Sequence, residues 1–158
     1  MIYSRWIHGT KDFDTVRALR TAVFVDELGI PDADVFDGFD PDAMHVVLFD
    51  DGEPLGTGRL YYDGEAFCIG RICVLMNRRG QGFGDMIARV LLDRALNMHA
   101  PRIRLITPPE HAGFYQKFGF VTLEGTYEEA GRPAVRMEVP AEDAVFPSTC
   151  GHGGKGGR

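Results

Sequence analysis

Residues 72–85, ICVLMNRRGQGFGD, decide the fold, because a short apolar run passes directly into a glycine-rich loop. Gly80, Gly82 and Gly84 alternate with other residues in this loop. Glycine permits backbone conformations that other residues avoid and lets the chain approach a ligand closely. A helix that begins after such a loop points free N–H groups and the positive end of its dipole towards the loop. The stretch therefore predicts a strand, a loop that binds phosphate or pyrophosphate, and a helix.

The same glycine spacing also fits a tight strand–helix connection that binds nothing. Two other phosphate-binding motifs fit it less well. The dinucleotide-binding motif has glycines in the order G-x-G-x-x-G and an acidic residue about 20 positions later, whereas the order here is G-x-G-x-G and the region around Arg104 is basic. A P-loop requires Gly-Lys-Ser or Gly-Lys-Thr, which this loop lacks. Arg78 and Arg79 add positive charge that favours a phosphate ligand.

Apolar periodicity predicts seven strands and three helices around this loop. The expected strands are Ile2–Ile7, His45–Phe49, Leu55–Tyr62, Ala66–Leu75, Ile103–Ile106, Phe120–Tyr127 and Ala134–Val139. The expected helices are Phe13–Leu28, the run from the glycine loop to about Met98, and Ala112–Phe118. The first helix presents one apolar face, made of Val16, Leu19, Val23 and Phe24.

The connections between these elements predict the topology. Asp51-Gly52 and Asp63-Gly64 favour tight type I′ turns, so the strands that they join form an antiparallel meander. The strand before the glycine loop, the helix after it and the strand Ile103–Ile106 form a β-α-β crossover, which is right-handed and joins parallel strands. We therefore expect an α+β domain in three layers, α/β/α, with a mixed, mostly antiparallel sheet of about seven strands. Residues 1–140 form this domain, and residues 141–158, which end in GHGGKGGR, form a flexible tail.

Bulk properties exclude several classes of protein. A length of 158 residues suits one domain. The formal net charge of −6 argues against general affinity for nucleic acid. The chain has no apolar run of the roughly 20 residues that cross a membrane, and its N-terminus lacks the layout of a signal peptide. Three scattered cysteines do not form a disulfide framework. We expect a cytoplasmic protein with reduced thiols that binds neither nucleic acid nor membrane.

Two motifs and three further segments resemble a known family. The pattern Arg79-x-x-Gly82-x-Gly84 resembles the pyrophosphate signature of the GNAT N-acetyltransferase superfamily. The segment FYQKFGF, residues 114–120, is similar to the second hallmark of that superfamily, a helix that carries tyrosine and is followed by Gly-Phe. Three upstream segments resemble the ElaA/YjcF-like bacterial branch: FVDELGIP at 24–31, DGFD at 37–40 and GTGRL at 56–60. The resemblance covers about residues 2–140 and implies the GNAT-like fold, which the element order above also matches.

The resemblance implies acetyl-CoA as co-substrate and no metal. The glycine loop would hold the CoA pyrophosphate, and the preceding strand would hydrogen bond to the pantetheine arm in the manner of an added strand. The two parallel strands are expected to splay apart and leave a slot for this arm. The residues expected to contact CoA are Ile72, Cys73, Val74, Arg79, Gly80, Gln81, Gly82, Phe83, Gly84, Asp85, Phe114 and Lys117. The family often has a polar residue where Thr107-Pro108-Pro109 lies, so no CoA contact is carried over there.

The resemblance also implies a mechanism in which a neutral amine attacks the thioester directly. Tyr115 matches the family's acid, which protonates the leaving CoA thiolate. A phenol with a pKa of ~10 can donate a proton to a thiolate whose conjugate acid has a pKa of ~8.5. The structural alternative for Tyr115 is a tyrosine that packs on the sheet beside Phe114 and Phe118.

The general base does not follow from the resemblance, because the strand before the loop has no carboxylate after Glu65 at its start. The candidate bases are Glu27, Asp37, Asp40, His45 and Glu129, acting directly or through a water. A histidine at the start of a strand, as His45 is, also fits a structural role. The acidic stretch IPDADVFDGFDPDA, residues 30–43, is most simply a solvated loop. Its Asp37 and Asp40, together with Glu129, are also candidates to attract a cationic amine.

The sequence therefore predicts an N-acetyltransferase that acts on a small-molecule amine, as a monomer or a homodimer. Two alternatives stay open. Residues 19–27 and 37–40 also resemble acyl-homoserine-lactone synthases, which share the fold but typically take their acyl group from a carrier protein and lack the glycine loop. The second alternative is a CoA-binding module without catalytic activity, because no base is identified.

Overall fold

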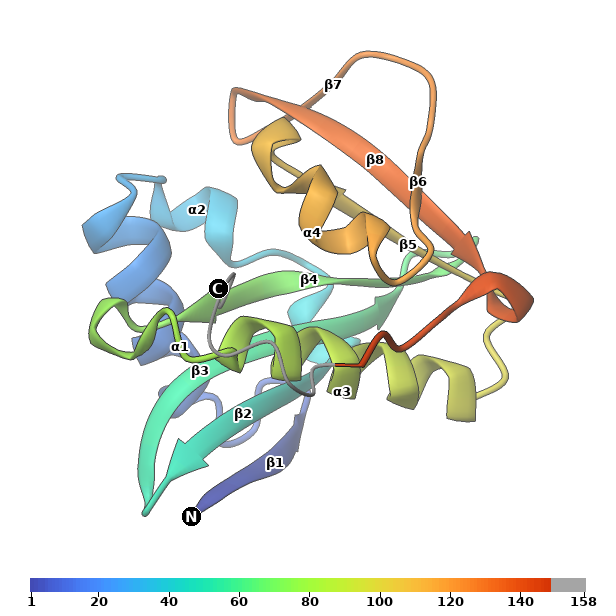
Figure 1. Ribbon diagram of the computed structural model, residues 1–158. Coiled ribbons are helices and arrows are strands. Elements are labelled where there is room, and N and C mark those ends of the chain that lie inside the picture. The colour runs from blue at the N-terminus through green and yellow to red at the C-terminus, as the bar shows by residue number, and fades with distance from the viewer. Residues whose placement is uncertain (149–158) are drawn as a thin grey trace.

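One mixed sheet of eight strands forms the centre of the computed structural model, which describes residues 1–148 (Figure 1). The strands lie in the order β1-β2-β3-β4-β5-β8-β6, and β7 pairs with β8. Only β4 and β5 are parallel among the strand pairs of the described residues, so the sheet is mixed and mostly antiparallel, as expected. The strands are β1 (Ile2–His8), β2 (Met44–Asp50), β3 (Glu53–Tyr62), β4 (Phe67–Val74), β5 (Arg102–Thr107), β6 (Val121–Thr122), β7 (Tyr127–Glu129) and β8 (Arg132–Pro140).

Helices cover both faces of this sheet. The α-helices are α1 (Asp14–Arg20), α2 (Asp32–Val35), α3 (Phe83–Asn97) and α4 (Ala112–Gln116). A π-helix, η1 (Thr21–Glu27), continues α1, and the 3₁₀ turns are η2 (Asp40–Asp42), η3 (Met76–Arg78), η4 (Pro109–His111) and η5 (Ala141–Asp143). Figure 1 shows α3 in front of the sheet and α1 behind it.

The alternation of side chains along β2 explains this arrangement of layers. Val46 and Leu48 belong to the core cluster that includes the buried face of α3, whereas Val47 belongs to a second cluster with Val16 and Leu19 of α1. Successive residues of a strand point to opposite faces of the sheet, so both faces of β2 are buried. The predicted α/β/α layering is thereby confirmed.

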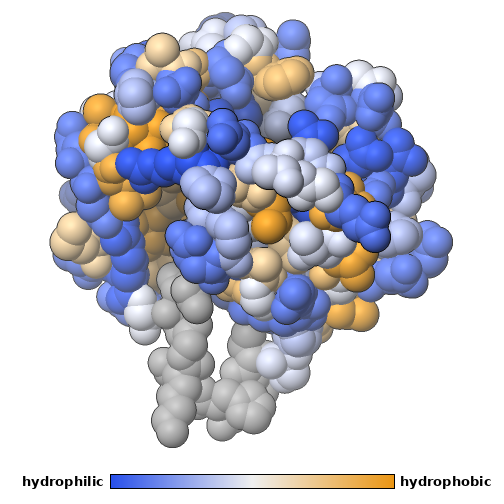
Figure 2. Space-filling view, turned by 90° about the horizontal axis from the view of Figure 1, so that it is seen from above, coloured by the Kyte–Doolittle hydropathy of each residue, from blue (hydrophilic) through white to orange (hydrophobic). Residues whose placement is uncertain are grey.

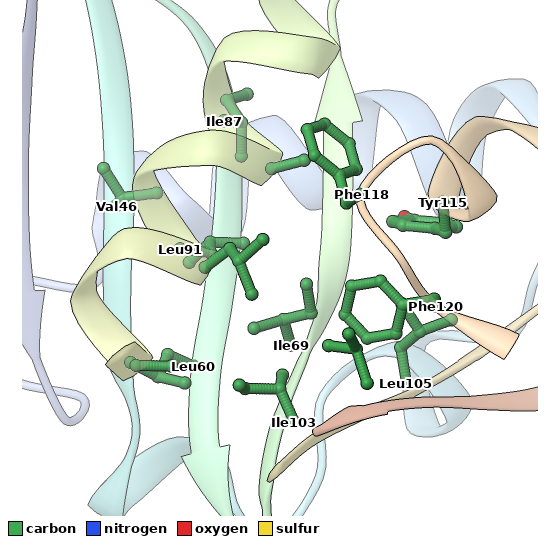
Figure 3. Packing of buried hydrophobic residues seen from close by; sticks show 14 of the residues in the cluster. Val46, Leu60, Ile69, Ile87, Leu91, Ile103, Leu105, Tyr115, Phe118 and Phe120 are labelled. Carbon is green, nitrogen blue, oxygen red and sulfur yellow. The ribbon is translucent and has the colours of Figure 1, made fainter. Parts of the chain in front are cut away.

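The helix α3 lies along the larger cluster because its apolar residues recur at helical spacing. Its fully buried residues are Ile87, Ala88, Leu91, Leu92 and Ala95. Figure 3 shows Ile87 and Leu91 on α3 in the same cluster as Ile69 and Ile103 from the sheet, with Phe118 and Phe120 on the other side of the cluster. The glycine loop therefore leads into a helix whose position is set by a large buried area.

Gly56 and Gly58 on β3 let α3 approach the sheet closely, because a Cβ atom at either position would collide with Ile87. A Cβ atom at Gly58 would lie 2.7 Å from Cγ2 of Ile87 and 2.8 Å from Cδ1 of Leu91. We expect Gly58→Ala to lower the free energy of unfolding by about 1 to 3 kcal/mol, since both neighbours are locked in a packed core. Urea unfolding measures the loss. Gly70→Ala on β4 is the control, because a Cβ atom there meets nothing within 4 Å; equal losses in the two variants would contradict the explanation.

Three local predictions differ from the structure. The second half of the predicted helix is the π-helix η1, in which the N–H of Leu28 bonds to the carbonyl of Val23, so Phe24 leaves the buried face. The turn at Asp63-Gly64 is a four-residue loop, because the Asp63 carboxylate accepts bonds from the N–H groups of Glu65 and Ala66. The strand predicted at 120–127 is interrupted between β6 and β7, where Gly125 has a φ of 122°. The sheet consequently has eight strands instead of about seven.

The segment after β8 packs against the domain as far as it is described. The N–H of Val145 bonds to the carbonyl of Phe118 at 3.0 Å, and the Arg89 guanidinium donates to the carbonyl of Pro147. The rest of the predicted tail, 149–158, lies outside the described residues, as does Cys150. Within residues 1–148, Cys68 and Cys73 are free and buried. No helix in this part of the chain is both long and apolar enough to span a membrane.

Candidate active site

The two parallel strands separate shortly after they meet. β4 and β5 pair only at Phe67–Ile103 and Cys68–Arg104, after which β5 continues along β8 up to Thr107. Figure 1 shows β5 running away from β4 beyond this contact. The edge of β4 at residues 69–74 that faces β5 therefore has no strand partner within residues 1–148.

A β-bulge interrupts β4 where this separation begins. Thr57 of β3 pairs with Cys73 and Arg59 pairs with Gly70, so two residues of β4 lie opposite the single residue Gly58. Arg71, one of the two, has a φ of 49°, which is unusual for a residue with a side chain. Bulges turn a strand locally and leave backbone groups without a partner in the ladder.

A cleft of about 720 Å³ occupies the space between the separated strands. One wall is apolar and contains Phe24 and Leu28 from η1 and its end. The bulge residues 70–72, the end of β5 with Pro108 and Pro109, the helix α4, and the β7–β8 hairpin form the other walls. Seen from above in Figure 2, the surface is mostly hydrophilic, with hydrophobic residues gathered in patches between the polar ones.

The glycine loop lies where β4 ends and α3 begins. Gly80 and Gly82 have φ values of 77° and 84°, and Gly82 is the residue before the first turn of α3. A Cβ atom at either glycine would meet nothing within 4 Å, so positive φ, not lack of space, requires glycine here. The first backbone bond of α3 runs from the N–H of Met86 to the carbonyl of Gly82. The preceding N–H groups, which include those of residues 83–85, have no partner within the helix. Together with the dipole of a 15-residue helix, they form a site suited to an anion.

Arg79 and Glu27, predicted for different roles, form one ion pair. Both ends of the Arg79 guanidinium bond to the Glu27 carboxylate, at 2.6 and 2.7 Å, and its Nε donates to the carbonyl of Val74. The bonds from Arg79 lower the pKa of Glu27, so this carboxylate is a poor proton acceptor. The structure thus joins η1 to the end of β4, and the positive charge of Arg79 is already neutralised.

Asp85 and Lys117, both predicted to contact CoA, also pair with each other. Nζ of Lys117 lies 2.6 Å from Oδ1 of Asp85 and 4.4 Å from the centre of the Phe114 ring. Burial opposes the charge on Asp85, but Lys117 and Arg89 lower the pKa of this carboxyl. The backbone N–H of Asp85 points along the helix axis independently of its side chain, so the carboxylate does not exclude an anion from the loop.

Tyr115 lies on the wall of the cleft and at the edge of the core. Its side chain is 9 % exposed, and its ring packs against Phe114 and Phe120 at centroid distances of 4.9 and 6.1 Å. Figure 3 shows it beside Phe120 at the edge of the cluster. Burial raises the pKa of Tyr115, and no bond from its hydroxyl to another of the residues 1–148 is present. The hydroxyl therefore stays protonated at neutral pH and is free to donate.

Asp40 belongs to a buried ion network and not to the cleft. Its carboxylate accepts bonds from Arg20 at 3.0 Å and from Arg59 at 3.1 Å. Arg20 and Asp40 are 0 % and 3 % exposed, so the charges have little contact with water. Arg59 also binds Asp37 at 2.6 Å. Asp40 is thus a structural counter-ion between two buried arginines.

Arg71 binds the two remaining acidic residues that were candidates to attract an amine. Its guanidinium bonds to Asp37 at 3.1 Å, to Glu129 at 3.3 Å, and to the backbone carbonyls of Asp34 and Val35. This side chain holds the loop after α2 and the β7–β8 hairpin against the bulge in β4. Asp37 and Glu129, which the sequence suggested as attractors of a cationic amine, are therefore paired with arginine.

His45 lies outside the cleft, 0 % exposed, in the same buried network as Arg20. Nδ1 accepts a bond from Arg20 at 3.2 Å, and Nε2 donates to the backbone carbonyl of Asp40 at 3.3 Å. Burial, together with the charge of Arg20, lowers the pKa of His45 to about 4. This arrangement fits a structural histidine that stays neutral.

The depressed pKa of His45 predicts a loss of stability in acid. The unfolded chain binds a proton at a pKa of ~6.5 and the folded protein only near 4, so stability is full above pH ~6.5 and falls below it. We expect a decrease of up to about 1.4 kcal/mol per pH unit in this window. Urea unfolding at pH 7, 6 and 5 measures the slope. His45→Gln removes the titrating group and is expected to flatten the slope over this range; an unchanged slope in the variant would assign the effect to other groups.

Comparisons with known proteins identify the family of this fold and site. The family model described as acetyltransferase (GNAT) domain matches residues 33–141. The chain belongs to the GNAT acetyltransferase family. It is 31% identical to the uncharacterized N-acetyltransferase YjcF of Bacillus subtilis over 120 residues, which are 75% of this chain and 86% of that protein. It is also 31% identical to the protein ElaA of Escherichia coli over 125 residues, covering 75% and 81%. The predicted ElaA/YjcF-like branch of the GNAT family is confirmed.

Solved structures of the GNAT fold match over almost the same length. An acyl-CoA N-acyltransferase from Pseudomonas aeruginosa superimposes with a TM-score of 0.78 at 27% identity, covering 87% of this chain and 99% of that one. The crystal structure of Escherichia coli ElaA gives a TM-score of 0.76 at 28% identity with the same coverage. This GNAT protein is an acyltransferase, and acyl-CoA is the acyl donor that the family implies.

The acyl-homoserine-lactone synthases share the fold at lower identity. The synthase BjaI superimposes with a TM-score of 0.70 at 14% identity, over 89% of this chain and 84% of that one, which shows the fold alone. BjaI is CoA-dependent. Dependence on CoA therefore does not by itself distinguish a synthase of this kind from an N-acetyltransferase; the two differ in their acceptor.

In this GNAT protein the cleft also contains residues that the sequence analysis did not select. Asp34, Arg71, Glu110, His111 and Arg132 all line it. Asp34 lies in the four-residue helix α2, Arg71 in the bulge of β4, Glu110 in the turn η4 and Arg132 at the start of β8. No periodic pattern marks these positions. The sequence contained one signal for His111. It precedes Tyr115 by four positions in a helical segment, so the two residues lie on the same side of the chain.

Proposed function

We propose that this GNAT acyltransferase transfers the acetyl group of acetyl-CoA to the nitrogen of a small-molecule amine by direct attack on the thioester. The observation that carries the proposal is one continuous path. It starts at the open amides of the glycine loop, follows the unpaired edge of β4 and ends at Tyr115 in the cleft. An extended CoA arm has its pyrophosphate at one end of such a path and its thioester at the other.

The chain's own groups supply the chemistry along this path. Main-chain N–H groups of residues 80–85 bind the pyrophosphate, and the β4 edge bonds to the pantetheine arm as a neighbouring strand. Unpaired backbone N–H groups at the bulge around Arg71 stabilise the oxyanion of the tetrahedral intermediate. Tyr115 donates a proton to the leaving thiolate.

The cleft favours an acceptor with an apolar body over a highly charged one. The wall that comes from η1 and the residues after it contains Phe24, Leu28 and Ile30. The acidic side chains Asp37 and Glu129 are paired with arginines, so they do not concentrate a polycation. We therefore propose a small primary amine with an aliphatic or aromatic body as the acceptor.

Calorimetric titration with CoA tests the donor site. We expect binding in the wild-type protein and a loss of at least about tenfold in affinity in Gly82→Val, because a β-branched residue is strained at a φ of 84° and displaces the amides. Gly38→Val is the control, since Gly38 has no positive φ and a Cβ atom there would meet nothing within 4 Å. Absence of any CoA binding by the wild type would refute the proposal.

Release of CoA in the presence of acceptors separates the alternatives. Acetyl-CoA is incubated with phenethylamine, spermidine, a peptide with a free N-terminus and S-adenosylmethionine. We expect release with phenethylamine above the others. Turnover restricted to S-adenosylmethionine would favour an acyl-homoserine-lactone-synthase-like reaction, and binding of CoA without turnover on any amine would favour the binding module.

A further inference from the structure

Most of the ionisable side chains in and around the cleft are already paired, which narrows the choice of a general base. Glu27 is bound by Arg79, and Glu129 is bound by Arg71. His45 and Asp40 are sealed in the buried network with Arg20. Among the described residues that line the cleft, three carboxylate or imidazole side chains form no ion pair and are left as proton acceptors: Asp34, Glu110 and His111.

His111 is held rigidly on the same side of the chain as Tyr115. The 3₁₀ turn η4 ends at His111 and passes directly into α4, with the backbone of His111 in helical conformation. Tyr115 follows four positions later, a spacing that puts two side chains one above the other on a helix. Both residues line the same cleft.

The two prolines before His111 fix its position. Pro109 begins the 3₁₀ turn η4, and the N–H of His111 bonds to the carbonyl of Pro108 at 3.0 Å. Proline rings lock φ, so this entry to the helix loses little further freedom when a substrate binds. The Thr107-Pro108-Pro109 segment, where this chain departs from the family pattern, thus leads directly into the turn that ends at His111.

We propose that His111 is the general base that removes a proton from the acceptor ammonium before it attacks acetyl-CoA. This inference rests on the proposed transferase function. Imidazole is the side chain that most often acts as a general base at neutral pH. Asp34 and Glu110 are carboxylates, so His111 is the better matched of the three.

The proton balance of the reaction is complete with these two residues. An imidazole nitrogen of His111 takes a proton from the ammonium, and the freed lone pair forms the C–N bond to the thioester carbon. The resulting oxyanion collapses and breaks the C–S bond, and Tyr115 protonates the thiolate. The amide nitrogen then returns its extra proton to the Tyr115 phenolate, and imidazolium releases its proton to water.

Two acceptors that differ in protonation test the role of His111. Phenethylamine is an ammonium ion at neutral pH, whereas aniline is already neutral. We expect His111→Ala to lower kcat with phenethylamine by about 100-fold and to leave kcat with aniline and the Kd for acetyl-CoA within about threefold of wild type. Millimolar imidazole is expected to restore part of the lost rate. His8→Ala, which changes an exposed histidine of β1 outside the cleft, is the control and retains wild-type kcat. Glu110→Gln is measured beside it, because Glu110 is a competing candidate base next to His111.

Each outcome decides between the inferences. Wild-type kcat in His111→Ala, or an equal loss with both acceptors and no rescue by imidazole, would overturn the role of His111 alone. A loss of the same size in Glu110→Gln would assign the base to Glu110 instead and also overturn it. A wild-type protein that binds acetyl-CoA but acetylates neither acceptor would overturn this inference together with the proposed function.

Discussion

Tyr115→Phe is expected to lower kcat by a factor of about 100 to 10,000, the range typical of a lost general acid. The Kd for acetyl-CoA is expected to change by less than about twofold, because the ring of Tyr115 and its contacts with Phe114 and Phe120 stay in place. Its hydroxyl has no bond within residues 1–148 that the substitution would break. Steady-state kinetics with acetyl-CoA and phenethylamine measure kcat, and calorimetry measures the Kd.

A second cleft tyrosine supplies the control for this experiment. Tyr61 also lines the cleft, where burial raises its pKa to about 12 and its ring lies under the Arg59 guanidinium. We expect Tyr61→Phe to keep kcat within about threefold of wild type. Unchanged kcat in Tyr115→Phe, or equal losses in the two variants, would remove Tyr115 as the acid.

The alkaline pH dependence gives a further check on Tyr115. Because burial raises its pKa above the ordinary value of ~10, the phenol stays protonated across the neutral and mildly alkaline range. Deprotonation of the Tyr115 phenol is therefore not expected to reduce kcat at any pH below about 10. A decline of kcat near pH 8 that disappears in Tyr115→Phe would contradict the buried, protonated phenol.

Asp40→Asn is expected to lower the free energy of unfolding by about 3 to 5 kcal/mol, the cost of removing one partner from a buried ion pair. Arg20 and Arg59 would keep their charges in an interior where they are 0 % and 2 % exposed. Asparagine has nearly the same volume as aspartate, so the loss comes from charge and not from a cavity. Burial already lowers the pKa of Arg20 to about 10, and Asp40 is the group that opposes this shift most.

Urea unfolding of Asp40→Asn and of a matched variant tests this network. Asp42→Asn changes the same residue type in the same 3₁₀ turn, but Asp42 is exposed, so we expect it to cost less than about 0.5 kcal/mol. A loss below about 1 kcal/mol in Asp40→Asn would show that the arginines are hydrated or repartnered. The same result would restore Asp40 as a candidate to attract a cationic amine.

Local chemistry determined most of what the sequence predicted correctly. The Asp51-Gly52 turn has positive φ at both residues, as a type I′ turn requires. Val16, Leu19 and Val23 are buried, as their helical spacing indicated. The glycine loop lies between a strand and a helix, and the parallel pairing of β4 with β5 followed from the crossover rule. These features depend on residues close together in the chain, so a single segment contains the information.

Only the tertiary structure decided which side chains are available for chemistry. Glu27, Asp37, Asp40 and Glu129 look equivalent in the sequence, yet each is paired with an arginine 19 to 58 positions away. The charge of a carboxylate is set by its nearest partners in space, and chain topology alone brings Arg79, Arg59 and Arg71 to them. In the same way, the fold assembles the cleft around Tyr115 and His111 from elements between residues 24 and 134. The sequence by itself determined the family, the layers and the glycine loop, because periodicity and turn chemistry are local; the partners of each ion depend on distances that only packing defines.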